Sequence, residues 1–150
     1  MDSSHAFLRD FSVGHQFEEL VLQKIQEKYP TAVLVPGKFK PYDIFIPEKD
    51  LKVEVKVDLK SQQTKNILIE LRMFGKKSGL LSTKADYWII YTGAEYLWTK
   101  PQKIIECIIL NNIPSQKVLG KDDDVEKDAC QNSTKMRPFS SRATYGSCRR

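Results

Sequence analysis

The stretch from residue 41 to residue 58, PYDIFIPEKDLKVEVKVD, most narrowly limits how this chain can fold. Residues 42–46 and 51–58 are rich in β-branched and aromatic side chains, which are typical of strands. Between them, residues 47–50 (PEKD) have the composition of a tight turn. We therefore expect an antiparallel hairpin. If its turn is centred between Glu48 and Lys49, Asp43 faces Glu54 across the two strands.

This predicted register gathers charged groups on one side of the hairpin. Asp43 and Glu54 lie opposite each other, and Lys56 is the next residue on the same side of its strand. The other side is apolar, and it carries Ile44, Ile46, Val53, Val55 and Val57. Two carboxylates held this close repel each other unless a proton or a cation lies between them. Magnesium is typically bound by one or two protein carboxylates, with water and phosphate completing its shell. The hairpin thus predicts a divalent-metal site able to act on a phosphodiester.

The remaining pattern predicts an α/β or α+β domain around one mixed central sheet. A first helix should end at Tyr29-Pro30, since apolar residues recur at helical spacing at Phe17, Leu20, Val21 and Ile25. Further strands are expected at residues 32–35, 66–73, 87–91, 95–99, 117–119 and 136–139, and a second helix at 102–110. Residues 75–79 (GKKSG) are expected to form a flexible basic connection.

Length and composition indicate a single domain over residues 1–150. The chain has 41% hydrophobic and 29% charged residues, which is within the globular range. It shows no secretion signal and no apolar stretch near the ~18 residues of a membrane span, so we expect no membrane and a cytoplasmic location. Three widely spaced cysteines and two histidines argue against a disulfide framework or a zinc site. The net charge of +5 favours an anionic partner.

The C-terminal segment, residues 120–150, gives no clear pattern of elements. Residues 121–128 are strongly acidic and should form a solvated loop, because they lack the glycine and alternating ligands of a calcium loop. Residues 135–150 carry five basic residues and no acid. Such a basic segment either binds phosphate or frays at the end of the chain.

Asp43, followed after ten residues by Glu54-Val55-Lys56, resembles the signature of the PD-(D/E)XK nuclease superfamily, and the resemblance covers roughly residues 11–99. It implies a restriction-endonuclease-like core, with a mixed central β-sheet flanked by helices, and a Mg²⁺-dependent deoxyribonuclease in which Mn²⁺ can substitute. It also implies that Asp43, Glu54 and the backbone carbonyl of Val55 bind the metal and that Lys56 acts on water and phosphate. In the signature the proline directly precedes the aspartate, whereas here Tyr42 intervenes.

Two further segments add to this resemblance. Residues 14–18 (GHQFE) are similar to the first helix of the Holliday junction resolvase-like branch. This similarity implies that Glu18 is a further catalytic metal ligand, with Glu19 as the alternative candidate for that role. Residues 75–88 are similar to the turn that follows the catalytic strand in phage-type nucleases. This turn offers lysines and hydroxyls to a nucleic-acid backbone, namely Lys76, Lys77, Ser78, Thr83 and Lys84. Glu70 is either an additional metal group or the partner of Lys65 or Arg72.

The resemblance implies DNA as the partner, duplex or branched, and a homodimer is a candidate state because related enzymes often cut two strands as dimers. For a phage-encoded chain the location would be the host cytoplasm. Two alternatives stay open. One is a catalytically inactive nucleic-acid-binding module on the same fold, which would use the basic turn without a metal. The other is a structural or interaction protein whose charges only solvate the hairpin; it predicts no magnesium binding.

Overall fold

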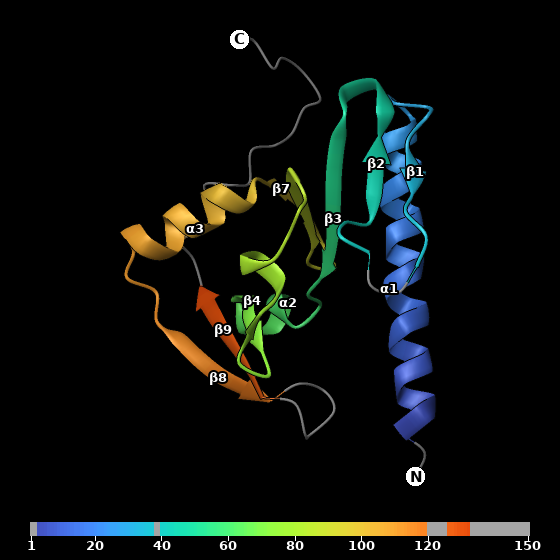
Figure 1. Ribbon diagram of the computed structural model, residues 1–150. Helices are drawn as coiled ribbons and strands as arrows, with labels where there is room; N and C mark the ends of the chain where they lie inside the picture. The colour runs from blue at the N-terminus through green and yellow to red at the C-terminus, as the bar shows by residue number, and fades with distance from the viewer. Residues whose placement is uncertain (1–2, 38–39, 120–125, 133–150) are drawn as a thin grey trace.

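The computed structural model of the protein is a mixed α+β fold built on two β-sheets (Figure 1). It describes residues 3–37, 40–119 and 126–132, with side chains described for residues 14–37 and 40–117. The elements in chain order are α1 (Ser3–Gln26), β1 (Val33–Leu34), β2 (Ile44–Ile46), the 3-10 turn η1 (Pro47–Lys49), β3 (Leu51–Val57), α2 (Ser61–Thr64), β4 (Ile67–Met73), β5 (Lys76–Lys77), the 3-10 turn η2 (Gly79–Leu81), β6 (Tyr87–Tyr91), β7 (Tyr96–Thr99), α3 (Pro101–Leu110), β8 (Ser115–Leu119) and β9 (Glu126–Asn132).

The central sheet has five strands in the order β1-β2-β3-β6-β7, and it is mixed, as predicted. The β3–β6 pair is parallel, while the other three pairs are antiparallel. In the β2–β3 hairpin Ile44 pairs with Val53 and Ile46 pairs with Leu51, which is the register expected from a turn centred between Glu48 and Lys49. The paired residues end at Ile44 and Val53, so Asp43 lies just before the strand.

Helix α1 covers one face of the central sheet. Its buried residues Val21 and Ile25 pack against an apolar set from the strands, made of Ile44, Ile46, Val53, Val55 and Ile89. The apolar side predicted for the hairpin therefore forms the core beneath α1, except that Val57 at its end is only half-buried. Leu20 was expected on the buried side of the helix, but it is 48% exposed, and Leu22 packs against the core instead.

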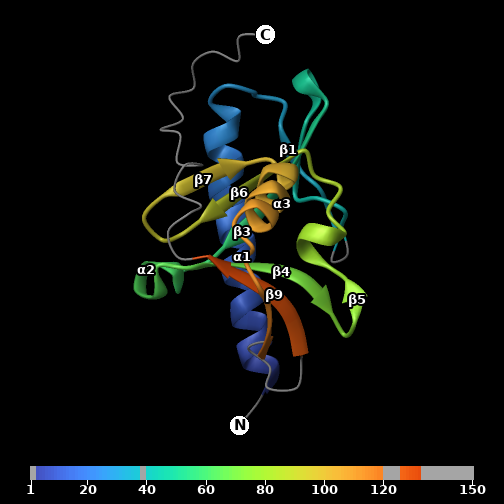
Figure 2. The ribbon, with the colours of Figure 1, turned by 90° about the vertical axis from the view of Figure 1, so that its left-hand side faces the viewer.

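The opposite face of the central sheet is covered by α3 and by a second sheet, as Figures 1 and 2 show from two directions. Here Trp88 and Ile90 from β6 join Ile69 of β4 and Ile104 of α3 in a second core. The second sheet has the strand order β5-β4-β9-β8. The expectation of one sheet was thus wrong: β4 does not join the central sheet, and it pairs with β5 and β9 instead.

The acidic segment, residues 121–128, was expected to be a loop, and its residues 121–125 lie outside the described part of the chain. Its last three residues, 126–128, belong to β9, which pairs with β4 and β8 and was not expected from the sequence. Strand β8 confirms the strand expected near residues 117–119. The strand expected at 136–139 and the whole basic segment 135–150 lie outside the described residues. Among the described residues, no helix combines the length and apolar character that a membrane-spanning segment needs.

The basic connection after β4 is ordered as a hairpin followed by a turn, which corrects the expectation of a flexible linker. Arg72 pairs with Lys77 and Met73 pairs with Lys76. The chain then enters η2, which packs against β4. This packing requires a glycine at position 79. A Cβ atom there would lie 2.4 Å from the carbonyl oxygen of Glu70, and the φ angle of residue 79 is +46°, a value that glycine adopts without strain.

Candidate active site

Asp43 is a buried acid placed at the start of β2. It is 6% exposed, and its backbone N–H donates to the carbonyl of Val53 at 2.9 Å. Its carboxylate Oδ2 accepts a hydrogen bond from the Val55 N–H at 2.7 Å. The side chain therefore binds a backbone group of β3, next to the point where the β2–β3 pairing stops. This contact satisfies one oxygen of a buried charge and fixes its position relative to β3.

Lys40 forms an ion pair with the other carboxylate oxygen of Asp43. Its Nζ lies 3.1 Å from Asp43 Oδ1 and 2.6 Å from Glu18 Oε2, so one ammonium bridges α1 and the start of β2. The Lys40 side chain is 14% exposed. Burial alone would lower the pKa of Lys40, but the hydrogen bonds and charges of Glu18 and Asp43 outweigh it, and its pKa is raised. The ammonium form is therefore the stable one.

Glu54 and Lys56 form a second ion pair two residues apart on β3, with Nζ 2.6 Å from Oε1. Burial raises the pKa of Glu54; the Lys56 ammonium opposes this shift and the Asp43 carboxylate adds to it. Burial alone would lower the pKa of Lys56, but the nearby carboxylates of Glu54, Asp43 and Glu70 raise it. The Nζ atom also lies 5.4 Å from the centre of the Trp88 ring, a cation–π distance.

These contacts bring the four predicted catalytic residues, Glu18, Asp43, Glu54 and Lys56, into one electrostatic cluster. The pKa of Glu54 responds to Asp43 and Lys40, although no direct hydrogen bond joins the two acids. Glu19, the alternative candidate to Glu18 as a metal ligand, is not in the cluster. It is exposed on α1 and lies 3.4 Å from the His15 ring.

Glu70 lies on β4 of the second sheet. Its Oε1 accepts a hydrogen bond from the Ser78 hydroxyl, which precedes η2. Its charge raises the pKa of Lys56, so it lies near the ammonium. Glu70 is thus the third carboxylate near Lys56, after Glu54 and Asp43.

The oxygen ligands of this cluster fit a hard divalent cation only in part. Asp43 and Glu54 supply two carboxylates, which is the usual protein contribution to a magnesium site. Within the described residues, however, no group of three or more His, Cys, Asp or Glu side chains is arranged to hold a metal ion. Between Glu18 and Asp43 lies the Lys40 ammonium, which pairs with one oxygen of each acid.

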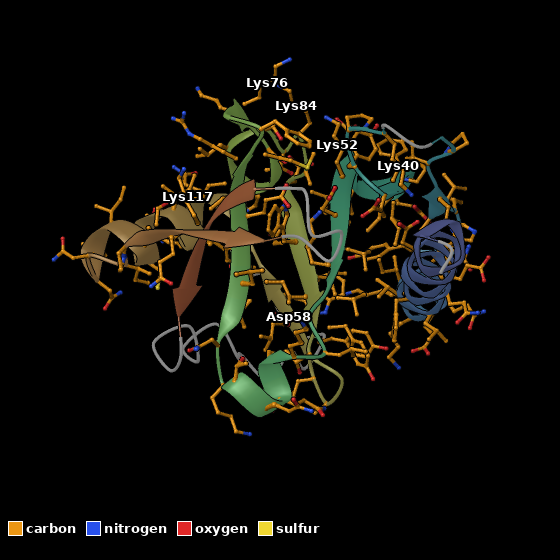
Figure 3. The ribbon with its side chains drawn as sticks, turned by 90° about the horizontal axis from the view of Figure 1, so that it is seen from below. Lys40, Lys52, Asp58, Lys76, Lys84 and Lys117 are labelled. Carbon is orange, nitrogen blue, oxygen red and sulfur yellow. The ribbon has the colours of Figure 1, made fainter. Side chains whose placement is uncertain are left out.

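The predicted nucleic-acid contacts divide into two kinds. Lys76, Lys77 and Lys84 are exposed. Figure 3 shows Lys76, Lys84, Lys52 and Lys40 along one side of the view, from three parts of the chain. The hydroxyls of Ser78 and Thr83 are instead engaged inside the protein: Ser78 donates to Glu70, and Thr83 accepts from Trp88 Nε1 at 3.1 Å.

Lys40 is the member of the cluster that sequence reasoning missed. The sequence feature that could have pointed to Lys40 is its position three residues before Asp43, an acid at the start of a buried strand, which lets the two side chains meet. Comparisons of the chain with protein-family profiles, curated proteins and solved structures found no match. The assignment of function therefore rests on the geometry of these residues.

Proposed function

We propose that this protein is a metal-dependent nuclease of the PD-(D/E)XK type, with a restriction-endonuclease-like core, which hydrolyses phosphodiester bonds in DNA. The observation that carries the proposal is the cluster on the β2–β3 hairpin. There, the charge of the buried Asp43 contributes to the raised pKa of the partly buried Glu54, and the Lys56 ammonium lies 2.6 Å from Glu54. Buried charges are costly unless they are paired or bind a metal, and a group of them with shifted pKa values is a candidate functional site.

Each residue has a distinct role in this proposal. Asp43 and Glu54, with the carbonyl of Val55, would hold Mg²⁺ or Mn²⁺. The ion would supply Lewis acidity toward the phosphate and a lowered pKa for a bound water. Lys56 keeps its proton, because its pKa is raised. It therefore acts as a fixed positive charge toward the phosphate oxygens rather than as a general base.

The proposed role of Glu18 in the metal site depends on its ion pair with Lys40. One of its oxygens, Oε2, is bound by Lys40 at 2.6 Å. Lys40 is thus the counter-ion between Glu18 and Asp43. A divalent cation would compete with it.

The experiment is a cleavage assay of the purified protein with magnesium, manganese or EDTA, on linear, nicked, single-stranded and four-way-junction DNA. Lys56→Met should lower the cleavage rate on the order of 100-fold, since an electrostatic group is lost from the reacting centre. The matched control is Lys103→Met. Lys103 also pairs with a glutamate, Glu106, at 2.7 Å, but on the surface of α3. Equal rates for Lys56→Met and the wild type would refute the proposal.

A second candidate function is a nucleic-acid-binding module that has no catalysis. It is favoured by the engagement of both Asp43 oxygens, one by the Val55 N–H and one by Lys40. This candidate predicts that DNA binds equally well with magnesium and with EDTA and is never cut. Magnesium-dependent product formation in the same assay excludes it.

A further inference from the structure

The turn between β4 and β5 has an unusual residue at its tip. Met73 pairs with Lys76, which leaves Phe74 and Gly75 as a two-residue loop. Their φ angles are +52° and +71°, the signature of a type I′ turn. Such turns strongly favour Asn-Gly, because a bulky side chain is strained at positive φ. Phenylalanine at this position therefore works against the local backbone.

Burial does not explain the choice of phenylalanine. The Phe74 side chain is 66% exposed, so most of its ring faces solvent. Neither the fold of the turn nor packing in a core requires an aromatic ring there. A strained residue that does not serve the fold points to contact with another molecule.

The surroundings of the ring indicate the chemistry of that molecule. Arg72, Lys76 and Lys77 on the same hairpin are all exposed and positively charged. Figure 2 shows the β4–β5 hairpin at the edge of the molecule, below η2. Protein–protein interface cores are depleted in lysine. An aromatic ring among cations is instead the pattern of single-stranded nucleic-acid binding, in which bases stack on the ring and lysines follow the backbone.

We propose that Phe74 is a base-stacking residue that binds an unpaired base of single-stranded or branched DNA, while Lys76 and Lys77 contact the flanking phosphates. Paired bases in a duplex hide their faces in the stack, so the ring selects DNA that offers an unpaired base. This inference deepens the proposed function and rests on its claim that DNA is the substrate. It does not depend on the metal or on Lys56.

The test uses Phe74→Asn, because asparagine is the residue that this turn prefers and the variant should fold at least as stably as the wild type. Binding is measured by fluorescence anisotropy in EDTA, so that no cleavage occurs, with labelled single-stranded, duplex and four-way-junction oligonucleotides. We expect Phe74→Asn to bind single-stranded DNA about tenfold more weakly, with duplex affinity unchanged. Phe74→Tyr should restore the affinity.

The matched control is Leu110→Asn, which removes an apolar side chain that is 79% exposed at the end of α3. It should leave all affinities unchanged. Equal binding of single strands by Phe74→Asn and the wild type would overturn the inference alone, as would an equal loss for duplex DNA. If the wild type bound none of the DNA forms, the proposed function would fall together with the inference.

Discussion

Both carboxylate oxygens of Asp43 are engaged, one by the Val55 N–H and one by the Lys40 ammonium. Lys40 in turn binds Glu18, while Glu54 binds Lys56. Asp43 and Glu18 therefore share one ammonium, that of Lys40, and Glu54 is paired with a second, that of Lys56. This pairing lowers the electrostatic cost of placing several acids together, and it makes the cluster depend on Lys40.

Lys40→Met should have opposite effects on stability and on metal binding. Removal of the ammonium leaves Asp43 and Glu18 facing each other without a counter-ion, so the metal-free protein should lose about 1–3 kcal/mol of unfolding free energy. The affinity for Mn²⁺ should rise, because its competitor is gone. Urea unfolding and isothermal titration calorimetry measure the two quantities. An unchanged Mn²⁺ affinity would show that Lys40 does not compete with the cation.

A second pair of residues predicts a pH dependence away from the site. The pKa of Glu48 is lowered, chiefly by a hydrogen bond with the Thr31 side chain, and the backbone N–H of Thr31, which donates to Glu48 Oε1 at 3.1 Å, adds to this shift. A lowered pKa contributes stability above the pKa of the unfolded chain, and that stability is lost as the pH falls through the folded-state value. Glu48→Gln should therefore be less stable than the wild type at neutral pH, and the difference should vanish in acid. A constant difference across the pH range would contradict this assignment.

At the residue scale, the sequence predicted the acids and Lys56 but not their partners. The hairpin alternation placed Asp43, Glu54 and Lys56 near one another, because a tight turn fixes the register. It could not predict that the Asp43 carboxylate binds a backbone N–H of β3. Lys40 was missed because its contact with Glu18 joins residues far apart in the chain.

At the scale of elements, η2 matters because it positions Ser78 against Glu70. This approach requires a glycine at position 79, where the nearest atom to a new Cβ would be a backbone oxygen at 2.4 Å. Gly93 also has a positive φ, of +92°, but there the nearest atom is the end of the Gln62 side chain, at 2.7 Å. A side-chain end can move, whereas a strand carbonyl cannot move without disturbing its sheet.

Gly79→Ala should consequently destabilise the protein more than Gly93→Ala does. Both variants carry the strain of a positive φ, on the order of 1 kcal/mol, and only the first adds a clash with backbone. Thermal unfolding of the two variants measures the difference. A lower stability of Gly93→Ala than of Gly79→Ala would contradict the close packing of η2 on β4.

The sequence predicted buried strands well and short exposed elements poorly. Residues 87–91 were expected to form a buried strand, and β6 spans them, because an uninterrupted run of aromatic and β-branched residues suits a strand covered on both faces. Strands β5 and β9 were not predicted. They consist mostly of charged and polar residues, and their pairing with β4 comes from tertiary contacts rather than from their own propensities.

On the scale of the whole molecule, two sheets rather than one form the fold. The alternation of side chains along a strand shows which residues of β4 share a face, but it does not show which sheet β4 joins. The second sheet carries the basic β4–β5 hairpin and also brings Glu70 toward Lys56. The proposed DNA-binding surface and the candidate active site are therefore connected through one strand, β4.

A salt titration tests this surface. Lys76→Ala combined with Lys77→Ala should reduce the slope of log affinity for DNA against log salt by up to about two units, since fewer counterions are released on binding. The control is Lys24→Ala combined with Lys103→Ala, two exposed lysines on helices α1 and α3. The control should keep the wild-type slope. Equal slopes for all three proteins would remove the hairpin from the DNA-binding surface.

The most direct test of the site is calorimetric titration of the metal-free protein with Mn²⁺, comparing the wild type with Glu54→Gln and with Glu106→Gln, a surface acid of α3. We predict that the wild type and Glu106→Gln bind Mn²⁺ alike, and that Glu54→Gln, which keeps the size of the side chain but loses its charge, binds at least about tenfold more weakly. Equal affinities for Glu54→Gln and the wild type, or no binding by the wild type, would contradict a metal site on the β2–β3 hairpin.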